Sequence, residues 1–416
     1  MNASQPWIYR LWSTVLLWIY RLWSTVEFKL ILSWLVVVIV TTLLDPGHVY
    51  WNKMADSAQL IQRSTVLLGF FALGSAIIII SGGIDLSSGS VIAMSATVFG
   101  CLMIVLDPEG FKSGTVSTNA VILAILGTLL SGVMVGTLHA WLITSVGLPP
   151  FVATLATLVG LRSFSRGLTP ILTSNKSQID FPDLNLRNVL IDVSLMTKVF
   201  IVFALILWFL MSRTVTGRHL QAMGGNEQAA KLSGIRTDRL KWLAYVIGAV
   251  SASIVGIFSF ADVGSAKPDI MARGYELNAI AASVIGGCSL QGGIGTIPGT
   301  ILGCLFLRTI IDSVQKIVGA GADVFEGMIV GIVVVVAVTF SQRGSGGLSR
   351  KPYFDNPIGW SMIPILALVS GLAFLLFCRE QKWYAPYQAM VFAGIVFVGL
   401  FIRALFEAFS KSSGSA

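Results

Sequence analysis

A carboxylate lies inside one of the long apolar runs of this sequence, next to a pair of glycines. Residues 81–90 read SGGIDLSSGS, so that Gly82 and Gly83 precede Asp85 and Ser87 follows it. A charge in the middle of a lipid bilayer costs roughly 2.5 to 3.5 kcal/mol. We therefore expect Asp85 at a cavity, at a helix start or at the membrane interface. The alternative is a purely structural role, in which its carboxylate caps the free amides of the next helix.

A second glycine pair interrupts a later apolar run in the same way. Residues 285–295 read IGGCSLQGGIG and share the pattern Gly-Gly-x-x-Leu-x-x-Gly with the first break, which predicts a parallel pseudo-repeat. Paired glycine breaks in the two halves of a transporter indicate the place where backbone polar groups face the substrate. The residues that we assign to this pathway belong to the two breaks and are Gly82, Gly83, Asp85, Ser87, Gly286, Gly287 and Gln291.

A polar, basic segment at 213–241 is long enough to hold a short helix. Asn226 can cap that helix, Glu227 suits its first turn and Gly234 suits its end. We predict a helix from Asn226 to Leu232. Because so short a helix is marginal in water, it needs a surface to dock against, and a soluble partner can supply one. The alternative is an ordinary basic loop.

The other reactive residue types form no catalytic or metal-binding pattern. The four cysteines are scattered, and His139 and His219 stand apart from other metal ligands. The sequence has no Gly-rich loop ending in Gly-Lys-Ser/Thr for nucleotide phosphates, no Gly-x-Ser-x-Gly elbow and no His-Glu-x-x-His helix. We expect no catalytic residue, no metal and no directly bound cofactor, so the energy for any transport has to come from a partner or a gradient.

The elements that carry these residues are expected to be membrane-spanning helices. Of the 416 residues, 55% are apolar and 12% charged, against roughly 25% charged in soluble domains, and the mean hydropathy is +0.82. A spanning helix needs about 20 mostly apolar residues, and the runs lack the alternation of barrel strands. We expect an all-α polytopic membrane helical bundle. Its ten core spans are predicted near 30–44, 66–81, 89–106, 120–144, 150–168, 199–212, 242–262, 275–287, 293–311 and 324–340, and two further spans near 358–377 and 386–406.

Charge and composition predict the orientation and the domains. The segment 213–241 carries six basic residues against two acidic ones, which places it in the cytoplasm together with the N-terminus; the net charge of +8 has the same explanation.

A Gly/Ser-rich basic stretch predicts a linker. The domains are an N-terminal extension at 1–26, a core at 27–341, the basic linker at 342–357 and a C-terminal helical hairpin at 358–416. In the extension the nonapeptide WIYRLWSTV occurs twice, either as a helix in the headgroup region or as a duplication without function.

Within roughly residues 60–341 the chain resembles the ribose/xylose/galactose-type permeases of binding-protein-dependent ABC sugar importers. The strings that carry the resemblance are GGIDLSSGS, GGNEQAAKLSGI and RGYELNAIAASVIGGCSLQGGIGT. The resemblance implies a bacterial inner-membrane protein, a homodimer or heterodimer of permeases, a cytoplasmic ATPase that holds ATP-Mg, an extracytoplasmic sugar-binding protein and no nucleic acid. It also implies a loop that couples to the ATPase, formed by Gly225, Asn226, Glu227, Ala229, Ala230 and Gly234. Gln228 and the two added C-terminal spans depart from the family pattern.

The segment RGYELN at 273–278 is predicted to lie where one span meets the external side. Glu276 and Asn278 can line the external mouth of the pathway or contact the binding protein. An interfacial anchor made of Arg273, Tyr275 and Glu276 explains the same residues equally well.

The side chains of the predicted spans favour a hydroxyl-rich, neutral substrate. Hydroxyls, amides and broken backbone bind through hydrogen bonds more than through countercharge. We therefore expect the permease subunit of an ATP-driven importer that brings a monosaccharide into the cytoplasm. The alternative is a secondary transporter coupled to an ion gradient, with Asp85 as its ion site. A purely structural membrane protein fits the paired helix breaks poorly.

Overall fold

Most of the described chain is helical. The computed structural model describes residues 25–45, 47–318, 326–332, 335, 339, 354, 357–380 and 386–413. Among these residues eight helices are long and apolar enough to cross a membrane, which confirms the expected all-α membrane bundle. The eight are α2 Val26–Leu44, α4 Met54–Ile80, α5 Ser88–Leu106, α7 Thr118–Thr144, α10 Val193–Arg213, α13 Thr237–Val263, α15 Ile297–Val318 and α18 Pro386–Ser413.

The remaining described elements connect or complete these helices. The helices are α3 Val49–Asn52, α6 Pro108–Ser113, α8 Pro150–Leu172, α9 Leu184–Leu190, α11 Val215–Gly225, α12 Glu227–Leu232, α14 Tyr275–Ile285 and α17 Pro357–Glu380. Two short strands, β1 Ile179–Asp180 and β2 Ser265–Ala266, pair antiparallel. Apart from Thr25 and Val26, the duplicated nonapeptide lies outside the described residues, as do most of the linker and much of the span predicted at 324–340.

Two of the predicted core spans differ from the other membrane helices. The span predicted at 150–168 is the long helix α8, but Arg162 and Arg166 make it less apolar than the eight spanning helices. The span predicted at 275–287 is the helix α14, which has only 11 residues. At 1.5 Å per residue α14 is about 16 Å long, roughly half the hydrocarbon thickness of a bilayer. The irregular segment 264–274 precedes it, with Met271 and Ala272 buried.

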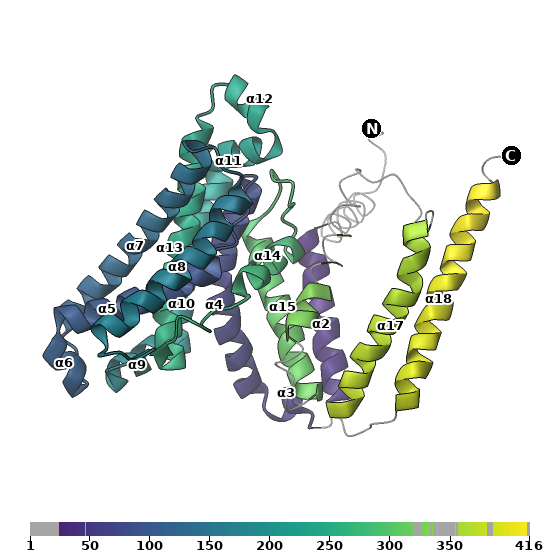
Figure 1. Ribbon diagram of the computed structural model, residues 1–416, viewed down its shortest axis with the longest axis horizontal. Helices are drawn as coiled ribbons and strands as arrows, with labels where there is room; N and C mark the ends of the chain where they lie inside the picture. The colour runs from purple at the N-terminus through teal and green to yellow at the C-terminus, as the bar shows by residue number, and fades with distance from the viewer. Residues whose placement is uncertain are drawn as a thin grey trace, which may run out of the picture.

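The bundle has two distinct ends (Figure 1). Helices α11 and α12 lie at one end, which we call the α12 face, and α3, α6 and α9 lie at the other, the α6 face. Helix α4 runs toward the α12 face, while α13 and α15 begin near it and run back. The loops on the two faces are therefore on opposite sides of the membrane.

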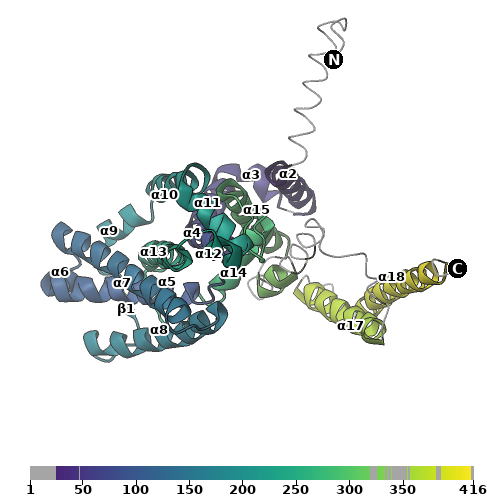
Figure 2. The same ribbon diagram turned by 90° about the horizontal axis from the view of Figure 1, so that it is seen from above.

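Helix α13 is at the centre of the core and packs against α4, α5 and α7 (Figure 2). Small residues allow these backbones to come close. A Cβ at Gly136 of α7 would lie 2.5 Å from the Cα of Val246, and a Cβ at Gly74 of α4 would lie 2.9 Å from the Cα of Gly248. Such contacts between small residues are the usual way in which helices associate in lipid. The core therefore depends on van der Waals packing of backbones around α13.

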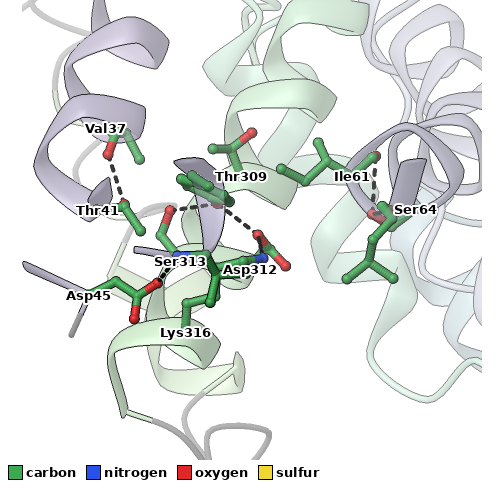
Figure 3. A network of polar contacts seen from close by, with 12 residues as sticks. Val37, Thr41, Asp45, Ile61, Ser64, Thr309, Asp312, Ser313 and Lys316 are labelled. Atoms are coloured by element: carbon green, nitrogen blue, oxygen red, sulfur yellow. Dashed lines mark hydrogen bonds and ion pairs between the residues drawn. The ribbon is translucent and has the colours of Figure 1, made fainter. Parts of the chain in front are cut away.

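A buried carboxylate joins α3 to α15 near the α6 face (Figure 3). Asp312 of α15 accepts hydrogen bonds from the Tyr50 hydroxyl of α3, at 2.7 Å, and from Lys316 one turn further along α15. The ammonium of Lys316 lies over the Tyr50 ring, 4.6 Å from its centre. In the same region Trp34 of α2 donates to Thr309 at 2.9 Å. These bonds attach α2 and α3 to the half of α15 that lies nearer the α6 face.

The two C-terminal helices form a hairpin of their own. Helices α17 and α18 pack along each other, and Gly371 contacts Ala393 closely. Phe354, Ile363 and Ala404 form a small apolar cluster that is distinct from the main core. The helices expected in the C-terminal hairpin are thus present in the described residues (Figure 1).

Candidate functional site

Three glycines from three separate segments meet at the α12 face, and we call them the glycine junction. They are Gly82 in the first break, Gly224 near the end of α11 and Gly292 in the second break. A Cβ at Gly292, whose φ is +87°, would lie 3.0 Å from the Gly82 Cα and 2.5 Å from the Gly224 carbonyl oxygen. A Cβ at Gly224 would collide with the carbonyl oxygen of Ile80, which accepts a 2.8 Å hydrogen bond from the Gly293 amide. The two predicted breaks thus contact each other and the helix that leads to α12.

The other predicted glycines and Gln291 lie around this junction. Gly83 packs against Tyr245 of α13, whose hydroxyl would be 2.7 Å from a Cβ at that position. Gly286 contacts the first turn of α15, and Gly287 faces α2. The Gln291 side chain is exposed. The glycines of the second break are therefore packed against neighbouring helices, whereas its Gln291 side chain is exposed to solvent.

Asp85 lies in the first break and is only 4% exposed. Its Oδ1 atom accepts hydrogen bonds from the Ser87 amide at 2.7 Å and from the Ser87 hydroxyl at 2.6 Å. Helix α5 begins at Ser88, so Ser87 rather than Asp85 occupies the cap position. The carboxylate closes a tight turn just before α5, and the helix cap expected of Asp85 is not formed.

A polar cluster that the sequence does not reveal surrounds this turn. The His139 ring of α7 is fully buried, and its Nε2 atom lies 2.7 Å from the Thr157 hydroxyl of α8 and 3.4 Å from the Ser87 hydroxyl. Tyr245 of α13 donates to the Ile84 carbonyl at 3.3 Å. In the sequence His139 stands alone because these partners are 18 and 52 residues away. Helices α7, α8 and α13 together hold the first break in place.

Glu276 and Asn278 lie in the first turns of α14, where Glu276 is half-buried and Asn278 is buried. The Glu276 carboxylate packs against Gly89 in the first turn of α5, where the free amides of a helix start favour a negative charge. Asn278 is 6% exposed and donates to Glu326 at 3.3 Å. The structure thus brings Glu276 next to the first break. That either residue lines the external mouth remains a prediction.

Arg162 positions the segment that leads into α14. This side chain on α8 is 7% exposed, and its Nη1 atom donates to the carbonyls of Pro268 at 2.7 Å and Met271 at 3.1 Å. This role is not evident from the sequence, in which the only signal is an arginine inside a predicted span. A cation there satisfies two carbonyls of a membrane-embedded segment that is not a continuous helix.

The helix predicted from Asn226 to Leu232 is confirmed as α12. Asn226 caps it, because its Oδ1 accepts from the Ala229 amide at 3.0 Å. The Glu227 carboxylate forms ion pairs with Lys231, at 3.0 Å, and with Lys241 of α13, at 2.7 Å. The pair with Lys241 attaches the short helix to a membrane helix.

The rest of the predicted coupling loop divides into a buried and an exposed side. Ala230 is buried, whereas Leu232 is 90% exposed at the end of α12. A Cβ at Gly225 would point into open space, and Gly234, with φ of +81°, turns the chain after the helix. The exposed side of the predicted coupling loop therefore includes the apolar side chain of Leu232.

Known proteins resemble this chain over the part that holds both breaks and α12. Residues 58–338 match the family described as "Branched-chain amino acid transport system / permease component". The chain is 31% identical over 318 residues to the ribose import permease of Bacillus subtilis, covering 74% of this chain and 91% of that protein. The chain belongs to the sugar ABC importer permeases.

Other relatives of the permease are named after different sugars. The D-allose transport permease of Escherichia coli is 31% identical over 280 residues, 66% of this chain and 79% of its own. The fructose import permease of Bifidobacterium longum is 31% identical over 279 residues, 64% of this chain and 76% of its own. No solved structure matches the permease. As a member of this family the permease is a transport subunit and a multi-pass protein of the inner membrane.

We expect α12 of the permease to stay docked on α13 at mildly acidic pH. Burial opposes ionisation of Glu227, but the hydrogen bonds from Lys241 and Lys231 outweigh it and lower the pKa of Glu227. An unfolded glutamate has a pKa of about 4.3. A carboxyl with a lowered folded pKa contributes stability above that value and loses it as the pH falls through the folded pKa. A spin label at Ser233→Cys should therefore stay immobile from about pH 7 to pH 5 and become mobile only after the pH has fallen below the unfolded value of about 4.3.

Two variants control this measurement. Glu227→Gln should remove the acid-dependent step, because no carboxyl is left to titrate. Glu109→Gln, which removes a carboxylate that lies 3.9 Å from Lys112 on the α6 face, should leave the step unchanged. A label that becomes mobile between about pH 7 and pH 5 would contradict the expectation, since a lowered pKa keeps Glu227 charged there.

Proposed function

We propose that the permease is the membrane subunit of an ATP-driven, binding-protein-dependent importer that moves a monosaccharide into the cytoplasm. The names of its relatives support the substrate class, since they describe ribose, D-allose and fructose transport. ATP-Mg is then bound by a separate cytoplasmic ATPase, and the sugar arrives on an extracytoplasmic binding protein. A second permease, identical or related, completes the pathway.

We assign the α12 face to the cytoplasm. The segment 213–241 on this face carries six basic and two acidic residues, and an excess of basic residues marks cytoplasmic loops. The same assignment places the start of α2 inside and the α6 face outside. The binding protein then docks on the α6 face and the ATPase on α12.

The observation that carries the proposal is the glycine junction. Its three members touch through backbone atoms, so a displacement of Gly224 cannot be absorbed by a side chain that changes rotamer. Gly224 belongs to α11, which continues through Asn226 into α12. A push on α12 from the ATPase therefore reaches both helix breaks directly.

Transport follows from this connection by alternating access. When the ATPase closes, α12 and α11 move together, because Asn226 alone separates them. The first break shifts the start of α5, and the second shifts the joint between α14 and α15. Nucleotide can drive this change only by binding the two states with different affinity. The contact between the ATPase and α12 is where that difference is applied.

An ion-coupled transporter is the second candidate, because the first break holds a buried acid and a buried histidine in one cluster. Asp85 and His139 are connected through Ser87. Such a site would respond to a proton or sodium gradient instead of ATP. Tracer uptake with and without an ion gradient separates the two candidates.

The deciding experiment is copurification from membranes in mild detergent, followed by an ATP hydrolysis assay. We expect an ATPase subunit to copurify with the wild-type permease. Glu227→Arg should abolish both its retention and the sugar-dependent stimulation of hydrolysis, because it breaks two ion pairs and adds a third cation beside Lys231 and Lys241. Glu109→Arg, which makes the same charge change on the α6 face, should have no effect. If the Glu227→Arg variant still retains the ATPase and its hydrolysis is still stimulated, the coupling assignment is wrong. Uptake that needs only an ion gradient would favour the second candidate.

A further inference from the structure

A pocket of about 440 Å³ opens between α4, α13, α15 and the segment before α14. The residues that line it come from the outer half of α4, the end of α13 and the middle of α15, so it lies toward the α6 face. Its size is within the range of small-molecule binding sites, about 300 to 1,000 Å³. It therefore has the volume and the position of an outer vestibule of the permease.

The walls of this pocket are strongly basic. Four cationic side chains line it, Arg63, Lys267, Arg273 and Arg308, against one carboxylate, Asp262. Asp262 forms an ion pair with Arg63. Within the described residues, neither Lys267 nor Arg273 has an ion-pair partner. Basic residues are expected on cytoplasmic loops rather than on the outer side, so orientation in the membrane does not explain this cluster.

Two of the cations, Arg63 and Arg308, each have a buried Nε donor that finds no partner in the described residues. The Arg308 side chain is 12% exposed, in the middle of a membrane helix, and meets Glu326 only at 3.5 Å. Burying a guanidinium N–H that has no hydrogen-bond partner costs free energy, unless an acceptor binds to it. The donor geometry of arginine suits the two oxygens of a carboxylate or phosphate.

Neutral groups that suit a sugar ring line the same pocket. Ser64, Ser259 and Ser265 bring hydroxyls, and Tyr275 brings an aromatic ring that is 5.9 Å from the Arg308 guanidinium carbon. Hydroxyls can bind the hydroxyls of a sugar, and an aromatic face can pack against its ring. The pocket thus combines groups for a hydroxylated ring with groups for an anion.

We propose that this pocket binds the anionic group of an acidic sugar, a carboxylate or a phosphate, on its way into the permease. The inference rests on the proposed import of a sugar and narrows its substrate to an anion, where the sequence alone favours a neutral molecule. A loop of the binding protein would meet exposed cations, but the Arg308 side chain is only 12% exposed and the Nε atom of Arg63 is buried. A lipid headgroup offers the same phosphate chemistry and is distinguished in the test.

The test uses the purified full-length permease in nanodiscs of neutral phosphatidylcholine and measures equilibrium binding of labelled D-galacturonate and D-galactose. These probes share a ring and differ mainly in the carboxylate. We expect galacturonate to bind about tenfold more tightly than galactose or better, because hydrogen bonds to charged groups are the stronger ones. Lys267→Gln/Arg273→Gln should bring the two affinities together. The folded core should not depend on these two side chains, because they form no ion pair in the described residues.

The matched control removes one cation from the same face outside the pocket. Lys112→Gln should keep the full preference for galacturonate, since Lys112 is on α6 and its side chain is 75% exposed. Replacing part of the phosphatidylcholine by anionic phosphatidylglycerol should not displace galacturonate. Displacement would show that a lipid headgroup occupies the pocket and would overturn the proposal.

Equal affinities for the two sugars, or no saturable galacturonate binding, would also overturn it. So would a Lys112→Gln variant that loses as much preference as the double variant. These results would not contradict the proposed importer function if the ATPase still copurifies and sugar still stimulates hydrolysis. A permease that has no ATPase partner contradicts the proposed function instead, whatever its preference between the sugars.

Discussion

Gly224→Ala is expected to destabilise the permease and abolish transport. Its new methyl group would be forced against the carbonyl oxygen of Ile80 and would come 2.6 Å from the Gly293 nitrogen. Both obstacles are backbone atoms, so the helix α11 has to move away from one or both breaks. Overpacking of this kind costs about 3 kcal/mol at the upper end of the usual range. We expect a lower melting temperature in detergent and tracer uptake near background.

Gly225→Ala is the matched control, because it adds the same methyl group one residue later. No atom of the described residues lies within 4 Å of a Cβ at Gly225, so the change should be neutral in both assays. A Gly224→Ala variant that melts and transports like Gly225→Ala would contradict the tight junction. A variant that melts normally but fails to transport would instead support a role of the junction in motion alone.

Arg162→Met should be the second most damaging change. Methionine keeps much of the apolar stem but cannot donate, so the carbonyls of Pro268 and Met271 lose a buried charged donor. Hydrogen bonds to charged groups contribute about 1.5 to 3 kcal/mol each. We expect a loss of about 3 kcal/mol or more in unfolding free energy. The segment 264–274 should also become accessible to thiol reagents at Ser265→Cys, which is 7% exposed in the intact protein.

Arg166→Met, one turn further along α8, is the control for this change. Its guanidinium pairs with Asp269 at 2.8 Å, but both side chains are about half exposed. Ion pairs of that kind contribute less than about 1 kcal/mol. Equal melting temperatures and equal thiol accessibility in the two variants would show that Arg162 does not hold the segment.

The parts of the site that can be predicted from the sequence are those that depend on neighbouring residues in the chain. The two glycine pairs stand out because they interrupt apolar runs, and α12 is recognisable from its cap Asn226, its acidic first turn and its terminal Gly234. Each signal lies within about ten residues, where helix capping and turn preferences act. The membrane helices are equally evident, since about 20 apolar residues in a row allow few other structures.

The parts that the sequence does not predict are contacts between distant segments. The glycine junction needs Gly224 to reach two breaks that lie on either side of it in the chain. The basic pocket collects Arg63, Arg273 and Arg308 from three elements, and in the sequence each looks like an isolated charge. Sequence spacing also cannot distinguish a full span from a half-length one at 275–287. The length of α14 is set by the packing of the segment before it against Arg162.

The half-length helix α14 has a consequence for how the protein is made. A translocon recognises about 20 apolar residues as one segment, and the 11 residues of α14 with Glu276 in the first turn fall well short of that. The segment 264–274 and α14 therefore have to enter the bilayer after, or together with, their neighbours α13 and α15. Biogenesis of this region should depend on tertiary folding, so a ribosome stalled before α15 would leave residues 264–285 outside the membrane core.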